Sequence, residues 1–498
     1  MHQLKKSRSF WSLAISVSLL LSLLVLYPLI YDGMAVTSDS VKYINMAQNV
    51  LQRNGISMLG CEGDLRPNTH WAPLFGWMLA LPMAPGLHWM TAARIWTLLS
   101  CFFMLLLLFL LVYRLSGSLL YSVLAQAVAA LHPVLLKHSG SILTEPVAWV
   151  ILLVLLHVII TFLYKPERRP ALWIGGLLGI AMLLRFAFLG FLPGMVLLAF
   201  LPARRIGWKR SFGYSVMISI IALIPFLLWY LRNVYVGSGL ADEGTGGNRL
   251  LISNAWVILL NGWKILLGFF SAPQNMAWLV IIPPAAVVLP VVFRVRSVFI
   301  GQKLHDLVYT GSLLIMAGYA FTMLILRTFS APVSLDGRMF SPFIFLLIMM
   351  AVCVLRRTDE AGSRQRVFIK GLFLLWAVWI VIKGGVAFFQ LQERSLYYAD
   401  DRWKESETLN YALQHLEADE ILTSDPEPFW LYGDICVHRL PLRHVAPKRS
   451  SQYEYRALVW FDCTNRFYIV CPRDIEWGKN AEQLDFKDGV IYLVNEPH

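Results

Sequence analysis

The sequence predicts a polytopic α-helical membrane protein, with about 11 transmembrane helices and a small C-terminal α/β extracytoplasmic domain. Three observations support this fold class. Hydrophobic residues make up 57% of the 498 residues and charged residues only 15%, whereas a soluble protein carries about a quarter charged residues. Apolar runs of about 18 or more residues recur along the chain. Positive residues form short clusters between these runs, so the formal net charge of +12 indicates cytoplasmic loops and not a nucleic-acid surface.

The N-terminal segment resembles the start of a signal peptide, but its apolar run is long and no small-residue cleavage site precedes Tyr31. We therefore expect a retained first helix. Arg185, Gly190 and Pro193 interrupt the run 171–202, which predicts two short helices there. With a window of about 20 residues per span, the expected helices are 10–31, 90–113, 117–136, 142–163, 171–186, 187–202, 211–231, 276–293, 306–327, 338–355 and 367–389.

The positive clusters occupy alternate loops, for example Lys5-Lys6, Arg204-Arg205 and Arg356-Arg357. This pattern predicts a multi-pass protein of the cell (inner or plasma) membrane with a cytoplasmic N-terminus and an extracytoplasmic tail. We expect a transmembrane domain over 1–389, including an outer loop over 32–89. The remaining 390–498 would form the soluble domain.

The tail from Gln390 onward is polar and mixed in composition, and about 100 residues suffice for a core. Alternating patterns predict a helix and four strands in it. They cover Thr408–Leu416 as helix and Glu420–Thr423, Ala457–Phe461, Phe467–Val470 and Val490–Val494 as strands.

Four of the six cysteines fall outside the membrane in this topology: Cys61, Cys436, Cys463 and Cys471. A disulfide is permitted there, and the sequence leaves its pairing open. No ligand spacing for a metal is present, so we assign no metal ligands and no certain cofactor, and a divalent metal stays open.

Ionisable residues gather near the outer ends of the predicted helices. Charged groups at membrane depth are costly and mark sites or pathways. Acids there can activate a hydroxyl, and arginines can hold a phosphate. The set comprises Asp39, Arg66, His70, Lys137, His138, Glu145, Arg185, Arg232, Asp336 and Arg338.

These residues belong to short motifs in a defined order: Asp39 with Tyr43, the segment HWAPLFGWMLALP, Thr144-Glu145-Pro146, Leu184-Arg185-Phe186, Pro225 with Leu231-Arg232-Asn233, and Arg338 with Pro342. Their order resembles the glycosyltransferase C superfamily, especially protein O-mannosyltransferases and lipid A aminoarabinose transferases, over nearly the whole chain. Two departures are visible. Ser40 follows Asp39 where many relatives have a second acid, and Met339 replaces a usual aromatic residue.

The resemblance implies a membrane glycosyltransferase, for a hexose or a pentose, with a polyprenyl-phosphate sugar as donor. The sugar would move to a hydroxyl of a glycan, lipid or protein acceptor on the outer face, by a single inverting displacement. Membrane lipids would be further partners, and no nucleic acid is expected. Asp39 would accept the proton of the hydroxyl, with Glu145 as a second catalytic candidate.

The resemblance also suggests roles in binding. Arg232 and Arg338, followed by Arg185 and Lys137, would hold the donor phosphate. Candidate contacts to the acceptor or the sugar are Tyr43, His70, Trp71, His138 and Asp336.

Structural alternatives stand beside these roles. Asp39 and Glu145 could cap their helices, and Arg185 could extend to the membrane interface. Asp336 could serve only as the ion-pair partner of Arg338. The alternative function is a lipid or glycan transporter or flippase of the cell envelope. This alternative predicts that the two halves of the chain are pseudo-symmetric.

Overall fold

The computed structural model describes residues 8–31, 33–59, 65–236, 254–255, 257–259, 303–329, 337–358, 363–392, 398–423, 425–433, 435–439, 457–461 and 481–494. The chain divides into two compact units. The helical unit contains Met1–Asp32, Thr69–Phe75 and Met90–Arg394, and the mixed unit contains Gly33–Asn68, Gly76–Trp89 and Ser395–His498. This division places two parts of the first outer loop with the tail, and the sequence-based boundary at 389/390 stays a prediction.

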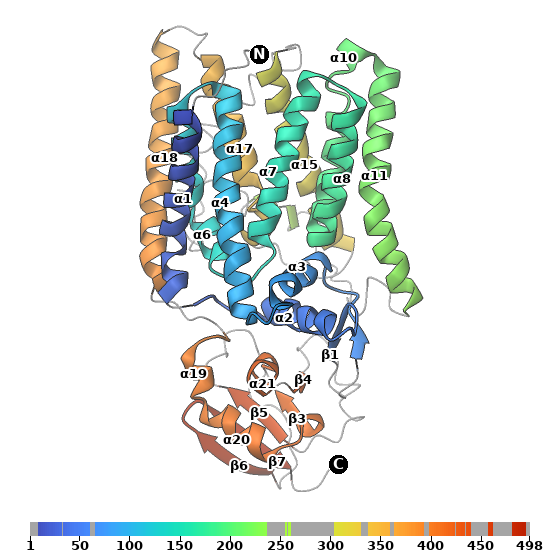
Figure 1. The fold of residues 1–498 in the computed structure, drawn as a ribbon, viewed down its shortest axis with the longest axis vertical. Coiled ribbons are helices and arrows are strands. Elements are labelled where there is room, and N and C mark those ends of the chain that lie inside the picture. Colours follow the sequence, from blue (N-terminus) through green and yellow to red (C-terminus); the bar gives the residue numbers. More distant parts are fainter. Residues whose placement is uncertain are drawn as a thin grey trace. The chain divides into compact units, whose positions relative to one another are not determined.

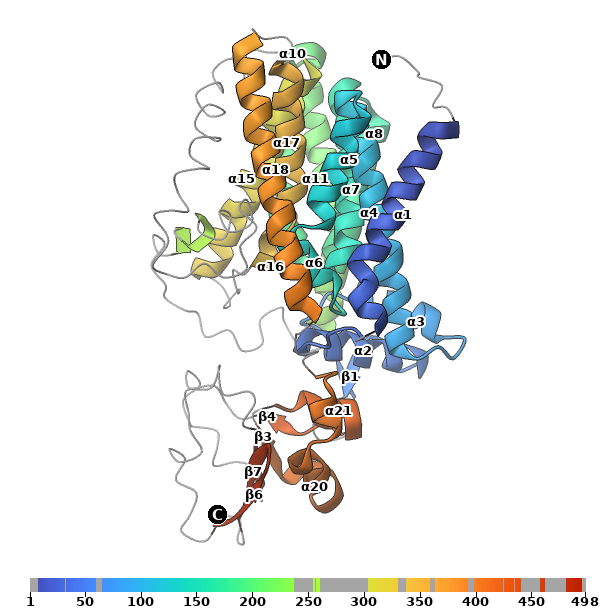
Figure 2. The same cartoon turned by 90° about the vertical axis from the view of Figure 1, so that its left-hand side faces the viewer.

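The helical unit is built mainly from long apolar helices. Figure 1 shows α7, α8 and α11 side by side, and Figure 2 shows α15, α17 and α18 together. Its described helices are α1 (Arg8–Tyr31), α4 (Trp89–Ser116), α5 (Leu119–Ala130), α6 (Pro133–Ser139), α7 (Glu145–Tyr164), α8 (Arg168–Leu184), the 3-10 helix η1 (Phe186–Phe191), α9 (Leu192–Leu198), α10 (Ala203–Ile206), α11 (Trp208–Tyr235), α15 (Leu304–Phe329), α16 (Gly337–Phe340), α17 (Phe343–Thr358) and α18 (Ser363–Gln392).

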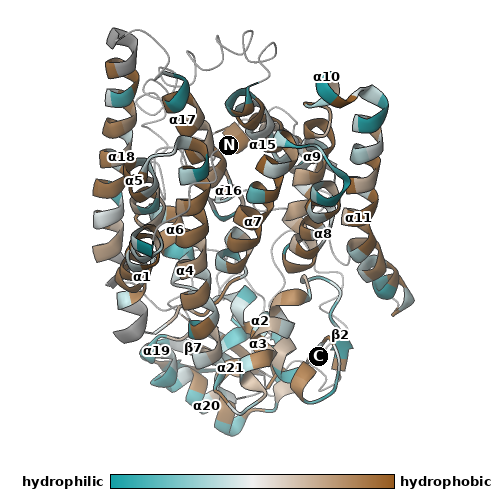
Figure 3. Ribbon diagram, turned by 45° about the horizontal axis from the view of Figure 1, so that its top comes forward, coloured by the Kyte–Doolittle hydropathy of each residue, from teal (hydrophilic) through white to brown (hydrophobic). Residues whose placement is uncertain are grey.

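Within the described residues, 6 helices are long and apolar enough to cross a membrane, or up to 7 if the bent pair α5–α6 counts as one span. They are α1, α4, α7, α11, α15 and α18. In Figure 3, most residues along these helices have the brown colour of hydrophobic residues. These helices confirm a multi-pass membrane architecture. The number of eleven spans stays a prediction, and the expected helix at 276–293 lies outside the described residues.

The expected single helix at 117–136 is wrong, because α5 and α6 meet at an angle of 60°. The cause is local. Pro133 has no N–H to continue the helix and occupies the first turn of α6 instead. His132 caps this new helix, and its Nδ1 accepts a hydrogen bond of 3.3 Å from the Val134 N–H. Consequently Lys137 and His138 lie on a helix and not in a loop.

The predicted break near Arg185 is confirmed. Arg185 has an extended backbone, with φ −157° and ψ 116°, between the end of α8 and the start of η1. The chain then continues through η1 into α9. This break turns the Arg185 side chain out of the helical repeat, which matters for the site described below.

The helices α9 and α15 approach unusually closely. A Cβ built on Gly194 would lie 2.5 Å from the Cα of Ile315, and one built on Gly318 would lie 2.5 Å from the Gly194 nitrogen. Small residues permit this approach of two backbones, as they do at many helix contacts in membranes. Tyr319, the neighbour of Gly318, is thereby fixed in the interior, where it is 1% exposed.

The mixed unit combines a five-stranded sheet with short helices. The strands lie in the order β4-β3-β5-β7-β6; β3 is parallel to β4 and β5, and β7 is antiparallel to β5 and β6. A separate antiparallel pair joins β1 (Ser57–Leu59) and β2 (Leu65–Pro67). The other elements are α2 (Ser38–Leu51), α3 (Leu74–Met83), α19 (Asp401–Lys404), α20 (Glu407–His415), η3 (Ala418–Glu420), β3 (Ile421–Thr423), α21 (Glu427–Gly433), β4 (His438–Arg439), β5 (Ala457–Phe461), β6 (Ala481–Phe486) and β7 (Gly489–Val494).

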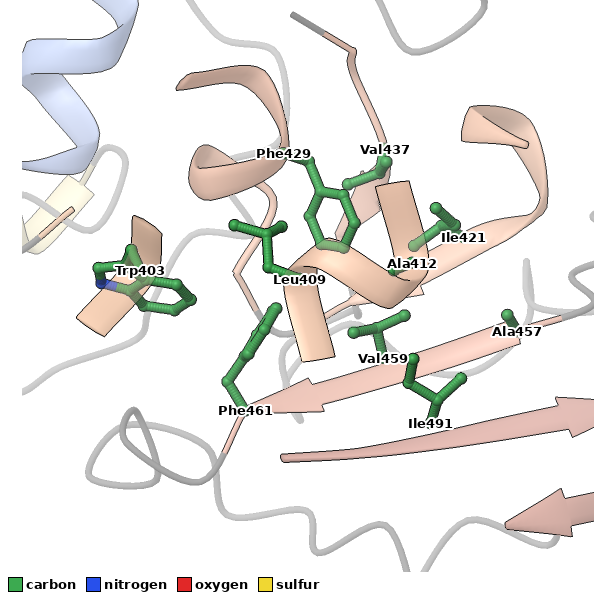
Figure 4. Packing of buried hydrophobic residues seen from close by; sticks show 10 residues of the cluster. All are labelled: Trp403, Leu409, Ala412, Ile421, Phe429, Val437, Ala457, Val459, Phe461 and Ile491. Atoms are coloured by element: carbon green, nitrogen blue, oxygen red, sulfur yellow. The ribbon is translucent and has the colours of Figure 1, made fainter. Parts of the chain in front are cut away.

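The core of this unit lies between α20, α21 and the central strand β5, as Figure 4 shows. Alternate residues of β5, namely Ala457, Val459 and Phe461, belong to this core, as expected for a strand whose side chains alternate between two faces. The predicted limits of β5 coincide with the structure, and the predicted helix Thr408–Leu416 corresponds to α20. The predicted strand Phe467–Val470 lies outside the described residues, and β4 and β6 were not predicted.

Candidate functional site

A buried carboxylate in the helical unit is held by two arginines. Glu145 is the first residue of α7, and its side chain is 2% exposed. Its Oε1 atom pairs with Nη1 of Arg185 and lies 3.2 Å from Nε of Arg338. Thr144 donates a hydrogen bond of 3.3 Å from Oγ1 to the second oxygen, Oε2. The three charged residues come from three distant parts of the chain.

This charge cluster of Glu145, Arg185 and Arg338 carries two positive charges against one negative charge. His138 on α6 lies within electrostatic range of all three residues, and Lys137 lies within range of His138. Burying such charges is costly, so an ionic cluster of this kind is weak evidence for a purely stabilising role. The surplus of positive charge suits an anion, and a guanidinium matches the geometry of phosphate oxygens.

Neutral side chains fix the backbone on which Arg338 lies. Trp149, one turn after Glu145, donates from Nε1 to the Oγ of Ser341 at 3.0 Å. Ser341 in turn donates to the Arg338 carbonyl at 2.9 Å. Tyr319 donates from its hydroxyl to the Met339 carbonyl at 2.8 Å. Trp149 and Tyr319 are not among the predicted site residues, although an indole N–H or a phenol within an apolar helix indicates a buried hydrogen bond.

Met339 has a direct part in the cluster. Its sulfur lies 3.0 Å from Nη2 of Arg185, which donates to it. Arg185 is therefore held from two sides, and its side chain is only 14% exposed. This geometry excludes the alternative that Arg185 extends to the membrane interface.

A small cavity of about 10 Å³ adjoins the charge cluster, enough for roughly one water molecule. A phosphate group would require its walls to move apart. It is lined by Glu145, Ala148, Trp149, Arg185, Ala187, Phe188, Phe191, Tyr319, Met339, Ser341 and Pro342.

Arg232, near the end of α11, is placed by a different set of contacts. Its guanidinium lies 4.8 Å from the ring centroid of Trp229 and donates to Oδ1 of Asn233 at 3.1 Å. Asn233 also donates to the Thr69 carbonyl at 3.1 Å, which ties α11 to the segment before His70. His70 is exposed, and its ring contacts that of Trp71, with a centroid distance of 4.7 Å.

Asp39 lies in the mixed unit, in the first turn of α2. The alternative that it caps this helix is wrong, because Thr37 is the N-cap and forms a capping box with Ser40. Asp39 is half-buried, and its charge is favoured at a helix N-terminus. Tyr43, one turn later, is buried at 7% exposure.

Two contacts from the tail hold the start of α2 within the mixed unit. Ser38 donates from its hydroxyl to Oε1 of Glu427 at 2.5 Å, and the Tyr398 N–H donates to the Val36 carbonyl at 3.1 Å. Glu427 is 1% exposed. No sequence pattern indicates this residue, because the contact joins segments that are 389 residues apart.

Several further predictions fall on residues outside the described part of the chain. They include Asp336 and the cysteines Cys61, Cys463 and Cys471. In the described part, Cys101 and Cys353 are buried free cysteines. In the same part of the chain, no group of three or more His, Cys, Asp or Glu residues could hold a metal ion.

No family model matches this sequence, and no curated protein matches it. The fold nevertheless has a counterpart among solved structures, in the class of the glycosyltransferase C fold. One such structure is ArnT from Cupriavidus metallidurans bound to undecaprenyl phosphate. The similarity covers 98% of both chains, with a TM-score of 0.54 and 11% sequence identity. The apo state of ArnT gives a TM-score of 0.47 and 13% identity over 97% of both chains. The expected resemblance is therefore confirmed for the fold.

Proposed function

We propose that the protein is a membrane glycosyltransferase that moves a monosaccharide from a polyprenyl-phosphate donor to an acceptor hydroxyl on the outer face of the membrane. The fold supports this proposal, since the ArnT structure of the same fold contains undecaprenyl phosphate. The observation that carries it is the charge cluster, in which Glu145 holds Arg185 and Arg338 with an excess of positive charge.

The chemistry explains why fixed cations are needed. When an acceptor hydroxyl attacks the anomeric carbon, the bond to the lipid phosphate breaks and the phosphate departs as an anion. Guanidinium groups that are held in place before the reaction stabilise this developing charge without reorganisation. Arg185 and Arg338 are the proposed phosphate ligands. Lys137 and Arg232 are further proposed sources of positive charge.

We propose that Glu145 does not act as a base. Its Oε1 is engaged by both arginines, and an ion-paired carboxylate is a poor proton acceptor. It therefore acts as a positioning residue for the two guanidiniums. Asp39 is the proposed base, a role that rests on the sequence motif, and a single displacement inverts the anomeric centre.

The test uses the full chain in lipid nanodiscs with radiolabelled undecaprenyl-phosphate pentoses and hexoses, and a cell-envelope extract as acceptor. We expect transfer of label from at least one donor and release of undecaprenyl phosphate. Asp39→Asn should reduce the rate by at least about 100-fold, because a general base contributes roughly 10²–10⁴. Asp485→Asn removes an exposed acid of β6 and should leave the rate unchanged.

Two results would contradict the proposal. One is the absence of transfer from every donor, combined with movement of intact donor across vesicle membranes, which would favour a flippase. The other is full activity of the Asp39→Asn variant, which would remove Asp39 from the mechanism.

A further inference from the structure

The mixed unit contains a second cavity that no proposed step uses. Its volume is about 280 Å³, near the lower end of the roughly 300–1,000 Å³ typical of small-molecule sites. Three separate stretches of the chain form its walls: α2, the start of α4 and the end of α21. The lining residues are Gln48, Trp89, Trp430, Leu431, Tyr432 and Gly433.

The walls combine aromatic rings with uncharged polar groups. Trp89, Trp430 and Tyr432 supply three rings, and Gln48 supplies an amide that can both donate and accept. Trp89, Tyr432 and Gln48 are half-buried, so parts of these side chains are accessible. A sugar ring has the matching surface, because its faces carry C–H groups and its rim carries hydroxyls. Aromatic side chains with a polar edge suit such amphipathic ligands.

Trp430 adds an unsatisfied donor to this wall. The residue is 9% exposed, and its indole nitrogen has no hydrogen-bond partner among the described residues. Buried donors without partners are rare in folded proteins, and each one requires an explanation. A hydroxyl of a bound ligand would satisfy this donor only if the wall moved, because the nitrogen itself is buried.

The charges near the cavity disfavour an anionic ligand. Among the described residues, none that lines the cavity carries a positive charge. Burial, together with the nearby carboxylates of Asp401 and Asp400, raises the pKa of Tyr432 to about 12. Its neutral hydroxyl donates to the Tyr398 carbonyl at 2.7 Å. A phosphate would meet acids here and not the guanidiniums that it requires.

We propose that this cavity binds a neutral saccharide. Such binding is independent of the transfer reaction proposed above.

Saturation-transfer NMR on the full chain in nanodiscs tests binding directly. The probes are maltose, cellobiose and lactose, with glucose 6-phosphate as the charged comparator. We expect saturation transfer from the protein to at least one neutral disaccharide and none to glucose 6-phosphate. Trp89→Ala should weaken the binding at least tenfold. Trp77→Ala removes a tryptophan of α3 that is 48% exposed and does not line the cavity, and should bind as the wild type does.

A second variant guards against misfolding at position 89. Gln48→Leu conserves side-chain size and removes only the amide, and it should also weaken binding. The proposal is overturned if none of the three disaccharides binds, or if both cavity variants bind as well as the wild type.

The transferase proposal and the saccharide-site proposal can be refuted independently of each other. Saccharide binding without transfer from any donor would refute the transferase and leave the saccharide site intact.

Discussion

Glu145 is the single residue that holds the charge cluster together. It stands at the start of α7, where an acid is favoured by the helix dipole, but its burial makes an unpaired charge prohibitive. The two arginines offset the cost of burying the carboxylate, and the carboxylate offsets the cost of burying the arginines. Loss of any one member leaves the others uncompensated.

We expect Glu145→Ala to lower the free energy of unfolding by about 3–5 kcal/mol, the range for breaking a buried ion pair from one side. Glu145→Gln should have a smaller effect, because the amide oxygen still accepts a hydrogen bond. Unfolding of the purified protein in detergent, followed by circular dichroism, measures both changes.

The matched control is Glu167→Ala. Glu167 pairs with Lys165 at 2.6 Å, but both side chains are largely exposed, at 49% and 70%. A surface pair of this kind contributes about 0–1 kcal/mol. Equal effects of the two alanine variants would show that Glu145 bears no buried charge of consequence.

The sequence could identify the members of the charge cluster but not their pairing. Ionisable residues near helix ends are conspicuous, which is why Glu145, Arg185 and Arg338 were all predicted site residues. The sequence offered Asp336, which lies outside the described residues, as a partner of Arg338, and that pairing stays a prediction. The sequence did not indicate the pairing of Arg338 with Glu145 that the structure contains. This pairing depends on how distant segments of the chain pack together.

At the scale of elements, the contact between α9 and α15 connects packing to the site. Gly194 and Gly318 let the two backbones touch, and Tyr319, next to Gly318, holds the Met339 carbonyl beside Arg338. A larger side chain at either glycine would push the two helices apart. It would therefore displace both Tyr319 and the backbone of the charge cluster.

Gly318→Ala should destabilise the protein by about 1–3 kcal/mol, the usual cost of overpacking, since its Cβ would meet the Gly194 backbone. The same variant should slow donor turnover through the displaced Tyr319. Thermal unfolding and the transfer assay measure the two effects.

Gly371→Ala on α18 is the control, because a Cβ there meets nothing within 4 Å. Alanine also favours a helix over glycine, so this variant should be neutral or slightly stabilising. If Gly318→Ala behaved in the same way, the close contact between α9 and α15 would not exist in solution.

The elements themselves were predictable to different degrees. Long apolar helices such as α4, α7 and α15 were predicted within a few residues, because bilayer thickness imposes a length that hydropathy reveals. The bend between α5 and α6 was missed, although Pro133 signalled it. The short strands β4 and β6 were missed because two to six residues carry little periodicity.

At the scale of the whole molecule, the positive clusters predict the orientation in the membrane. An alkaline phosphatase fused after His498 should be active in intact bacterial cells, and a green fluorescent protein fused before Met1 should be fluorescent. The reason is that phosphatase folds outside the cytoplasm, while lysine- and arginine-rich loops stay inside.

The exchanged fusions, with phosphatase at the N-terminus and fluorescent protein at the C-terminus, should both be inactive. The reverse pattern would overturn the orientation. Activity of the same reporter at both ends would indicate an even number of spans and would refute the count of eleven.

The mixed unit has a consequence for how the protein is made. Two of its three stretches end by Trp89, and the third begins at Ser395. At about 5–20 residues per second, the ribosome needs roughly 15–60 s to synthesise the intervening segment of roughly 300 residues. Throughout that interval the nascent α2 has neither the carboxylate that accepts from Ser38 nor the backbone N–H that binds Val36. Chains whose synthesis stops early would therefore expose an unfinished surface, on which chaperones and proteases can act.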